Sequence, residues 1–115
     1  MEYVVKFTPE CEQWFLSLTV GEKDSVMTGI ELLGTLGPQL GYPYSTKILG
    51  SRYSQMRELR IQHKGHPYRI LYVFDPERAA ILLLGGDKIG DDRWYRKKVP
   101  IAEKRYDKYL AAMKR

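Results

Sequence analysis

The chain has 115 residues, 43% of them hydrophobic and 29% charged, which is the composition of one soluble globular domain spanning residues 1–115. No apolar run reaches the roughly 20 residues that a membrane span needs, and residues 1–10 lack the basic leader and long apolar core of a secretory signal, so we expect a cytoplasmic protein. The single cysteine, Cys11, excludes an intramolecular disulfide and fits a reducing compartment. We expect its thiol to be buried and structural.

The net charge of +5 is unevenly distributed along the chain. Residues 1–46 hold two Lys or Arg against six Asp or Glu, whereas residues 47–98 hold twelve against six and residues 99–115 hold five against two. The acidic and basic parts are therefore different structural elements. A basic face on a small domain suggests a polyanionic partner, nucleic acid first, and a solvated surface without a partner is the alternative.

The first part of the chain predicts a strand followed by two helices. Residues 2–7 are rich in valine and aromatic residues, and Thr8 and Pro9 then suit the cap and the first position of a helix. After a break at residues 19–21, a second helix is expected from about Glu22 to Leu36. Apolar residues at helical spacing should form core on the two helices: Cys11, Trp14, Phe15, Leu18, Val26, Ile30 and Leu33.

The rest of the chain predicts a sheet and a final helix. The expected elements, in chain order, are a loop at 37–43, a short strand or edge piece at 47–50, antiparallel strands at 57–62, 68–75 and 79–84, a glycine-rich loop at 85–92, and a helix that begins at Pro100. This order predicts an α+β fold, in which an antiparallel sheet of about four to five strands has a two-helix pair on one face and is followed by a C-terminal helix. The opposite face of the sheet should carry arginines and be open.

Three arginines, Arg57, Arg60 and Arg69, lie inside strands that are otherwise apolar, and we expect them to give one sheet face a cationic character. Such a face suits cleavage of RNA without metal, in which the 2′-hydroxyl attacks the adjacent phosphate. The three arginines and Lys88 would stabilise the charge on the phosphoryl oxygens. Tyr95 would orient the phosphate, stack on a base or donate a proton.

Histidine and aspartate residues offer two other chemistries. His63 and His66 could form an acid–base pair or bind a metal. Three loop residues, Asp87, Asp91 and Asp92, could also bind a metal. Both histidines lie in a hairpin turn, where a polar side chain needs no function, and Asp and Gly are ordinary turn residues. No cysteine pair or HExxH pattern supports a metal site. We therefore expect neither a metal nor a cofactor.

The order of motifs between residues 57 and 88 resembles the RelE/ParE superfamily of type II toxins, and most closely HigB or phage Gp49-like toxins. The residues that carry the resemblance are Arg57-Glu58-Leu59-Arg60, then Gly65, then Tyr68-Arg69-Ile70-Leu71-Tyr72, then an apolar strand to Leu84 and Gly-Asp-Lys ending at Lys88. The resemblance implies a small cytoplasmic bacterial toxin that a cognate antitoxin protein neutralises. RelE-like members cleave messenger RNA in the ribosomal A site, whereas ParE-like members share the fold and inhibit DNA gyrase.

The resemblance also implies roles for single residues. Arg69 matches the central-strand arginine of the family, which contacts the scissile phosphate. Lys88 and Tyr95 fall near the basic and the aromatic residue that follow the last strand. Arg57 and Arg60 occupy a strand where RelE-like members place basic residues. The loop at 85–95 is longer and more acidic than in the family, and the C-terminal helix is unusually complete. Further RNA contacts are expected from Lys47, Arg52, Arg93, Arg96 and Lys97.

We therefore predict a ribosome-dependent endoribonuclease (an mRNA interferase) that needs no cofactor and has the ribosome, mRNA and an antitoxin as partners. The cluster of strand arginines with Lys88 and Tyr95 favours cleavage, since a gyrase inhibitor does not need cations converging on one site. A ParE-like gyrase inhibitor and a non-toxic RNA-binding remnant are the alternatives. We expect Arg69 to lie outside the core; the structural alternative for it is an ion pair with Glu58 across the sheet.

Overall fold

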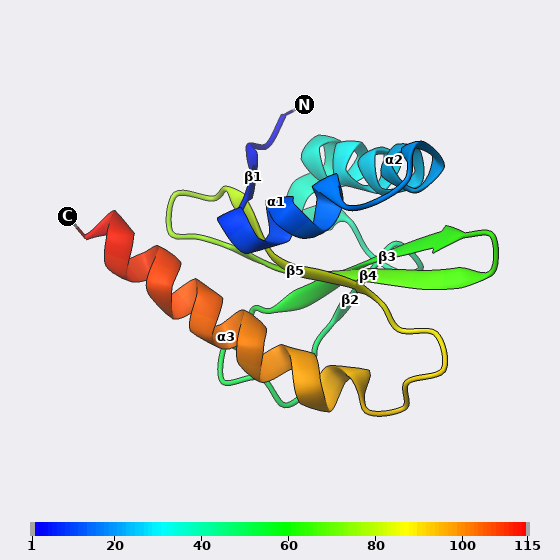
Figure 1. The fold of residues 1–115 in the computed structure, drawn as a ribbon. Helices are drawn as coiled ribbons and strands as arrows, with labels where there is room; N and C mark the ends of the chain where they lie inside the picture. Colours follow the sequence, from blue (N-terminus) through cyan, green and yellow to red (C-terminus); the bar gives the residue numbers. More distant parts are fainter. Residues whose placement is uncertain (1, 115) are drawn as a thin grey trace.

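The computed structural model describes residues 2–114 and shows one five-stranded sheet with helices on both faces (Figure 1). The elements in chain order are β1 (Val5–Phe7), α1 (Pro9–Leu16), α2 (Val20–Leu36), the 3₁₀ turn η1 (Gly37–Gln39), β2 (Ser45–Lys47), β3 (Arg57–His63), β4 (His66–Phe74), β5 (Ala80–Asp87) and α3 (Trp94–Met113). The strand order is β1-β5-β4-β3-β2. The α+β prediction is confirmed, but the sheet is mixed, because β1 runs parallel to β5 while the other neighbours are antiparallel.

Helices α1 and α2 cover one face of the sheet, as predicted (Figure 1). Thr8 caps α1 by accepting a hydrogen bond from the Cys11 backbone N–H. At the start of α2, Thr19 and Glu22 form a reciprocal capping box, so this helix begins two residues earlier than predicted. The Cys11 thiol is fully buried in the core between the helices and the sheet, which confirms the prediction for it.

Helix α3 covers part of the opposite face, so the expectation of a fully open face was wrong (Figure 1). The strands β4 and β5 are buried on both sides because their residues are apolar at nearly every position, not at alternate ones. A second core therefore forms between α3 and the sheet: Leu71, Val73, Ile81, Leu83, Trp94, Val99, Ala102 and Tyr106 are its main members. No helix among residues 2–114 is both long and apolar enough to cross a membrane.

Two elements differ from the prediction at the end of β5 and the start of α3. Residues 85–87 continue β5 instead of forming a loop, and α3 begins at Trp94, with Pro100 inside it. Tryptophan rings pack closely on the two glycines of β5, Trp14 from the helix pair on one face and Trp94 from α3 on the other. A Cβ on Gly85 would come within 2.2 Å of the Trp14 ring, and one on Gly86 within 3.1 Å of the Trp94 ring. The glycines are therefore needed for close packing within a strand, whereas their composition suggested a loop.

Candidate active site

The candidate site lies on the α3 side of the sheet, where residues of four strands form three cross-strand rows. We call these residues the arginine face. From the end nearest the α3 core outward, the rows are Thr46–Glu58–Leu71, Arg60–Arg69–Gly86 and Gln62–Pro67. Paired residues of neighbouring strands point to the same side of a sheet, so the side chains within each row lie next to one another.

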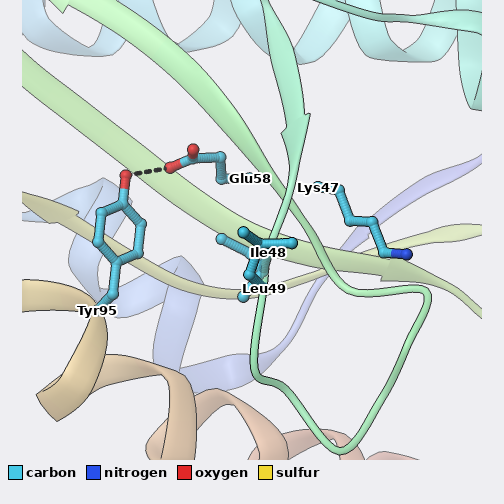
Figure 2. Close-up of a pocket in the computed structure, with 5 residues that line it drawn as sticks. All are labelled: Lys47, Ile48, Leu49, Glu58 and Tyr95. Carbon is cyan, nitrogen blue, oxygen red and sulfur yellow. Dashed lines mark hydrogen bonds between the residues drawn. The ribbon is translucent and has the colours of Figure 1, made fainter.

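Glu58 is the centre of the first row and is only 7% exposed. The Tyr95 hydroxyl donates a hydrogen bond to Glu58 Oε1 over 2.5 Å, and the Thr46 hydroxyl donates to Glu58 Oε2 over 2.5 Å. Figure 2 shows Tyr95 reaching from α3 toward this carboxylate on the sheet. Burial and the hydrogen bond to Glu58 raise the pKa of Tyr95, so the phenol is protonated at neutral pH and serves as a donor.

Arg69 is buried, at 4% exposure, which corrects the expectation that it lies outside the core. Its Nη1 donates to the Tyr68 carbonyl over 2.9 Å, and its Nε lies 3.4 Å from Glu58 Oε1. The predicted alternative, an ion pair with Glu58, is therefore present in the structure. The same Nε has no hydrogen-bond partner, so part of the donor capacity of this guanidinium is unused.

Arg60 stands directly opposite Arg69 in the second row. The Arg60 guanidinium lies 5.7 Å from the centre of the Tyr42 ring, and the Lys88 ammonium lies 5.8 Å from the centre of the Tyr95 ring. Neither cation forms an ion pair with an acidic side chain within residues 2–114. The structure thus brings together four of the five predicted catalytic residues, and two of them, Arg60 and Lys88, carry uncompensated charge.

Arg57 is the exception, because it points to the other face of the sheet. It lies three residues before Arg60, and an odd separation along a strand reverses the side. Its Nε donates to the Ser45 hydroxyl over 2.9 Å, and Ser45 is hydrogen-bonded to the Tyr72 hydroxyl at 2.6 Å under the helix pair. The expectation of a single cationic face that includes Arg57 was therefore wrong.

Two of the residues predicted to contact RNA are already paired with acidic side chains. Arg52 binds Asp107, with Nη2 2.6 Å from Oδ2, and also lies 3.7 Å from Glu103. Lys97 binds Asp91 over 2.9 Å. These pairs fasten loops to α3, and they offset the charge that the prediction assigned to RNA.

The other three residues predicted to contact RNA are exposed. Arg93 and Arg96 lie at the start of α3, next to Tyr95. Lys47 lines a pocket of about 330 Å³ with Ile48, Leu49 and the Glu58–Tyr95 pair. Figure 2 shows the Lys47 side chain directed away from that pair, so its ammonium does not reach the carboxylate.

The two histidines occupy the end of the β3–β4 hairpin, where His63 and His66 face each other. His63 Nδ1 is 2.7 Å from the Ser25 hydroxyl, and His66 Nδ1 is 2.5 Å from Asp87 Oδ2. Each ring is thus held by a polar neighbour of its own. Within residues 2–114, no three His, Cys, Asp or Glu side chains are grouped as metal ligands would be.

Reasoning from the sequence assigned no function to Glu58, although it is part of the site. It lies two residues before Arg60, so the strand period alone places both on one face. Its contact with Tyr95 joins residues 37 positions apart and depends on how α3 packs on the sheet. The sequence contains no local signal for that contact.

Comparisons with known proteins identify the family of the chain and proteins that share its fold. Residues 13–107 match the family described as phage derived protein Gp49-like (DUF891). HigB3 of Mycobacterium tuberculosis, named as a candidate toxin, is 46% identical over 105 residues, which are 90% of this chain and 90% of HigB3. HigB2 of the same organism, also named as a candidate toxin, is 38% identical over 100 residues; these are 85% of this chain and 50% of HigB2.

Two solved structures share the fold at low sequence identity. A mutant of the E. coli toxin RelE in the free state has a TM-score of 0.58 and 14% identity, covering 82% of this chain and 92% of RelE. An archaeal RelE–RelB complex from Pyrococcus horikoshii OT3 has a TM-score of 0.58 and 15% identity, covering 78% of this chain and 99% of that one. The chain therefore belongs to the phage-derived Gp49-like family, is similar to HigB3 and HigB2, and has the fold seen in the RelE structures.

Proposed function

We propose that the chain is the toxin of a type II toxin–antitoxin system and that it cleaves messenger RNA on the ribosome. The observation that carries the proposal is the row in which Arg60 stands opposite Arg69, beside the Tyr95–Glu58 hydrogen bond. Its relatives HigB3 and HigB2 are named as candidate toxins, which supports the same reading.

In the proposed reaction, the 2′-oxygen of one nucleotide attacks the adjacent phosphorus and the bond to the 5′-oxygen breaks. The products are a 2′,3′-cyclic phosphate and a free 5′-hydroxyl. Arg60 and Arg69 hold the phosphoryl oxygens and stabilise the negative charge that builds on them. Lys88 adds a third cation at the edge of the site, and the protonated Tyr95 phenol gives its proton to the leaving 5′-oxygen.

Acceptance of the 2′-hydroxyl proton is the demanding step for this chain. Glu58 is the carboxylate nearest to the arginines, but Tyr95, Thr46 and Arg69 already engage its oxygen atoms. We therefore propose that the ribosome orients the 2′-hydroxyl for in-line attack, which is a large effect in itself. In this proposal the proton of the 2′-hydroxyl passes to a water molecule as the bond to phosphorus forms. Free RNA should accordingly be cut poorly, and efficient cleavage of naked RNA by the pure protein would contradict this.

We further propose an antitoxin protein that covers the arginine face in the cytoplasm. Residues 47–98 carry twelve Lys or Arg against six Asp or Glu, which should attract an acidic or amphipathic segment. One of the structures with this fold is described as a RelE–RelB complex. Recovery of no partner encoded by a neighbouring gene, in a pull-down from the native host, would count against the antitoxin.

The decisive experiment is induction of the chain in a bacterium with separate labelling of newly made protein and DNA. Immediate arrest of protein synthesis, with cut ends mapped inside translated messages, is the expected result. Arrest of DNA synthesis with continued translation would instead indicate a ParE-like gyrase inhibitor. The Arg60→Ala variant is the matched control, because it should be expressed at the same level without stopping translation.

A further inference from the structure

A hollow of about 460 Å³ opens on the outer two rows of the arginine face, lined by Pro43, Tyr44, Arg60, Gln62, Pro67 and Arg69. We propose that this hollow binds one unpaired base of single-stranded RNA, with the Tyr44 ring as its stacking surface and the Gln62 amide at its edge. The proposal rests on the proposed function, because it assigns the base next to the phosphate that Arg60 and Arg69 hold.

Tyr44 is placed for this role by the backbone next to it. Its carbonyl accepts a hydrogen bond from the Arg60 N–H over 2.8 Å, which extends the pairing of β2 with β3 by one residue beyond the Ser45–Leu59 pair. Tyr44 therefore lies opposite Arg60 and on the same side of the sheet. It is 53% exposed, so a flat aromatic surface is fixed at the wall of the hollow and left uncovered.

The remaining walls supply what a nucleotide requires. Pro67 pairs with Gln62 across the hairpin and gives an apolar surface, while the exposed Gln62 side chain offers both an amide donor and a carbonyl acceptor. Single-stranded RNA is recognised by stacking of unpaired bases on aromatic rings and by hydrogen bonds to their edges. The phosphate attached to such a base would meet Arg60 and Arg69, which both line the hollow.

An acidic protein segment would use the two arginines but would gain less from the other walls. Carboxylates need cations, whereas an exposed aromatic ring with an amide beside it suits the face and the edge of a base. This difference makes RNA the favoured occupant and the antitoxin the competing one.

The test uses an RNA tetranucleotide made uncleavable by 2′-O-methyl groups, and the same molecule with its bases removed. Fluorescence anisotropy should show that the wild type binds the intact tetranucleotide on the order of tenfold more tightly than the base-free one. Tyr44→Ala and Tyr44→Leu should reduce binding of the intact molecule to the base-free level without changing binding of the base-free one. Tyr44→Phe should bind as the wild type does. Val20→Ala, a change at a 77% exposed position on α2, should have no effect.

Gln62→Leu tests the edge contact. Tetranucleotides that carry each of the four bases should differ less in affinity for this variant than for the wild type.

The proposal is overturned if Tyr44→Ala and Tyr44→Leu weaken the binding of the intact and the base-free tetranucleotide equally, or weaken the binding of neither. It is also overturned if these variants bind RNA normally and fail only to bind the antitoxin. Because the assay needs no ribosome and no cleavage, its outcome is independent of whether translated messages are cut.

Discussion

The guanidinium of Arg69 lies against the carboxylate of Glu58, and the two residues are only 4% and 7% exposed. A buried ion pair contributes little net stability compared with an apolar pair, but removal of one partner leaves the other buried and uncompensated. Arg69 therefore has two separable effects, one on the fold and one on the proposed reaction.

Arg69→Ala should lower the cleavage rate by about a hundredfold, because it removes a preorganised donor to the phosphoryl oxygens. It should also lower the free energy of unfolding by on the order of 3 kcal/mol, because Glu58 loses its partner. Cleavage of a reporter message on purified ribosomes and thermal unfolding followed by circular dichroism measure the two effects separately.

The double variant Glu58→Gln with Arg69→Gln separates these effects further, since it removes both buried charges and leaves an uncharged amide at each position. We expect it to unfold at a higher temperature than Arg69→Ala and to remain inactive. A double variant that is both stable and active would exclude the ion pair from the reaction.

Arg57 and Arg60 form a matched pair, because both are half-buried on β3 and point to opposite faces. Arg60→Ala should reduce cleavage by at least about tenfold through loss of a charged donor. Arg57→Ala should leave cleavage nearly unchanged and cost about 1 kcal/mol of stability, through loss of its hydrogen bond to Ser45. Equal losses of cleavage would show that the face under the helix pair takes part in the reaction.

Tyr95→Phe removes only the hydroxyl that donates to Glu58. Burial raises the pKa of Tyr95, so the wild-type phenol has a proton to donate at neutral pH. Loss of that donor should slow single-turnover cleavage by about a hundredfold, with a change in stability of only about 1 kcal/mol. Full activity of Tyr95→Phe would restrict Tyr95 to stacking or packing.

Stability should depend on pH through Glu22, which accepts a hydrogen bond from the Tyr68 hydroxyl and caps α2. These contacts, the Tyr68 bond first, lower the pKa of Glu22 from 4.5 to about 2. A carboxyl whose pKa is lower in the folded state stabilises the fold fully above its unfolded pKa, and this contribution is lost as the pH falls toward the folded pKa.

Glu22→Gln should therefore lower the melting temperature at pH 7, and its difference from the wild type should shrink between pH 4.5 and pH 2. Glu31→Gln, at an exposed position of the same helix, is the control and should follow the wild type at each pH. A difference for Glu22→Gln that stays constant with pH would contradict the assignment.

Much of the fold could be predicted because its signals are local. Thr8 with Pro9 marks the start of α1, and the apolar spacing of α2 marks its buried stripe. The start of α3 was misplaced because Pro100 looks like a first helical residue, whereas the helix in fact begins where Trp94 packs on Gly86. That contact joins distant parts of the sequence, and no local pattern reports it.

The site was predictable to the extent that it depends on strand period. Arg60 and Arg69 were expected on one face, and the structure pairs them there. The opposite face of Arg57 follows from its separation from Arg60 by three residues. The role of Glu58 could not be derived, because it depends on the pairing of Thr46 with Glu58 and on the position of Tyr95 above the sheet. Local sequence determines neither.

The missing side chain at position 86 sets how closely α3 approaches the sheet. Gly86 pairs with Arg69 on β4, and a Cβ at this position would stand only 3.1 Å from the Trp94 ring. Tyr95 follows Trp94 directly, so the close packing of Trp94 on Gly86 also influences where the Tyr95 hydroxyl lies relative to Glu58. A residue without any functional group thus helps to position the hydrogen bond between Tyr95 on the last helix and Glu58 on the arginine face, because a methyl group added there would press on the neighbouring Trp94 ring.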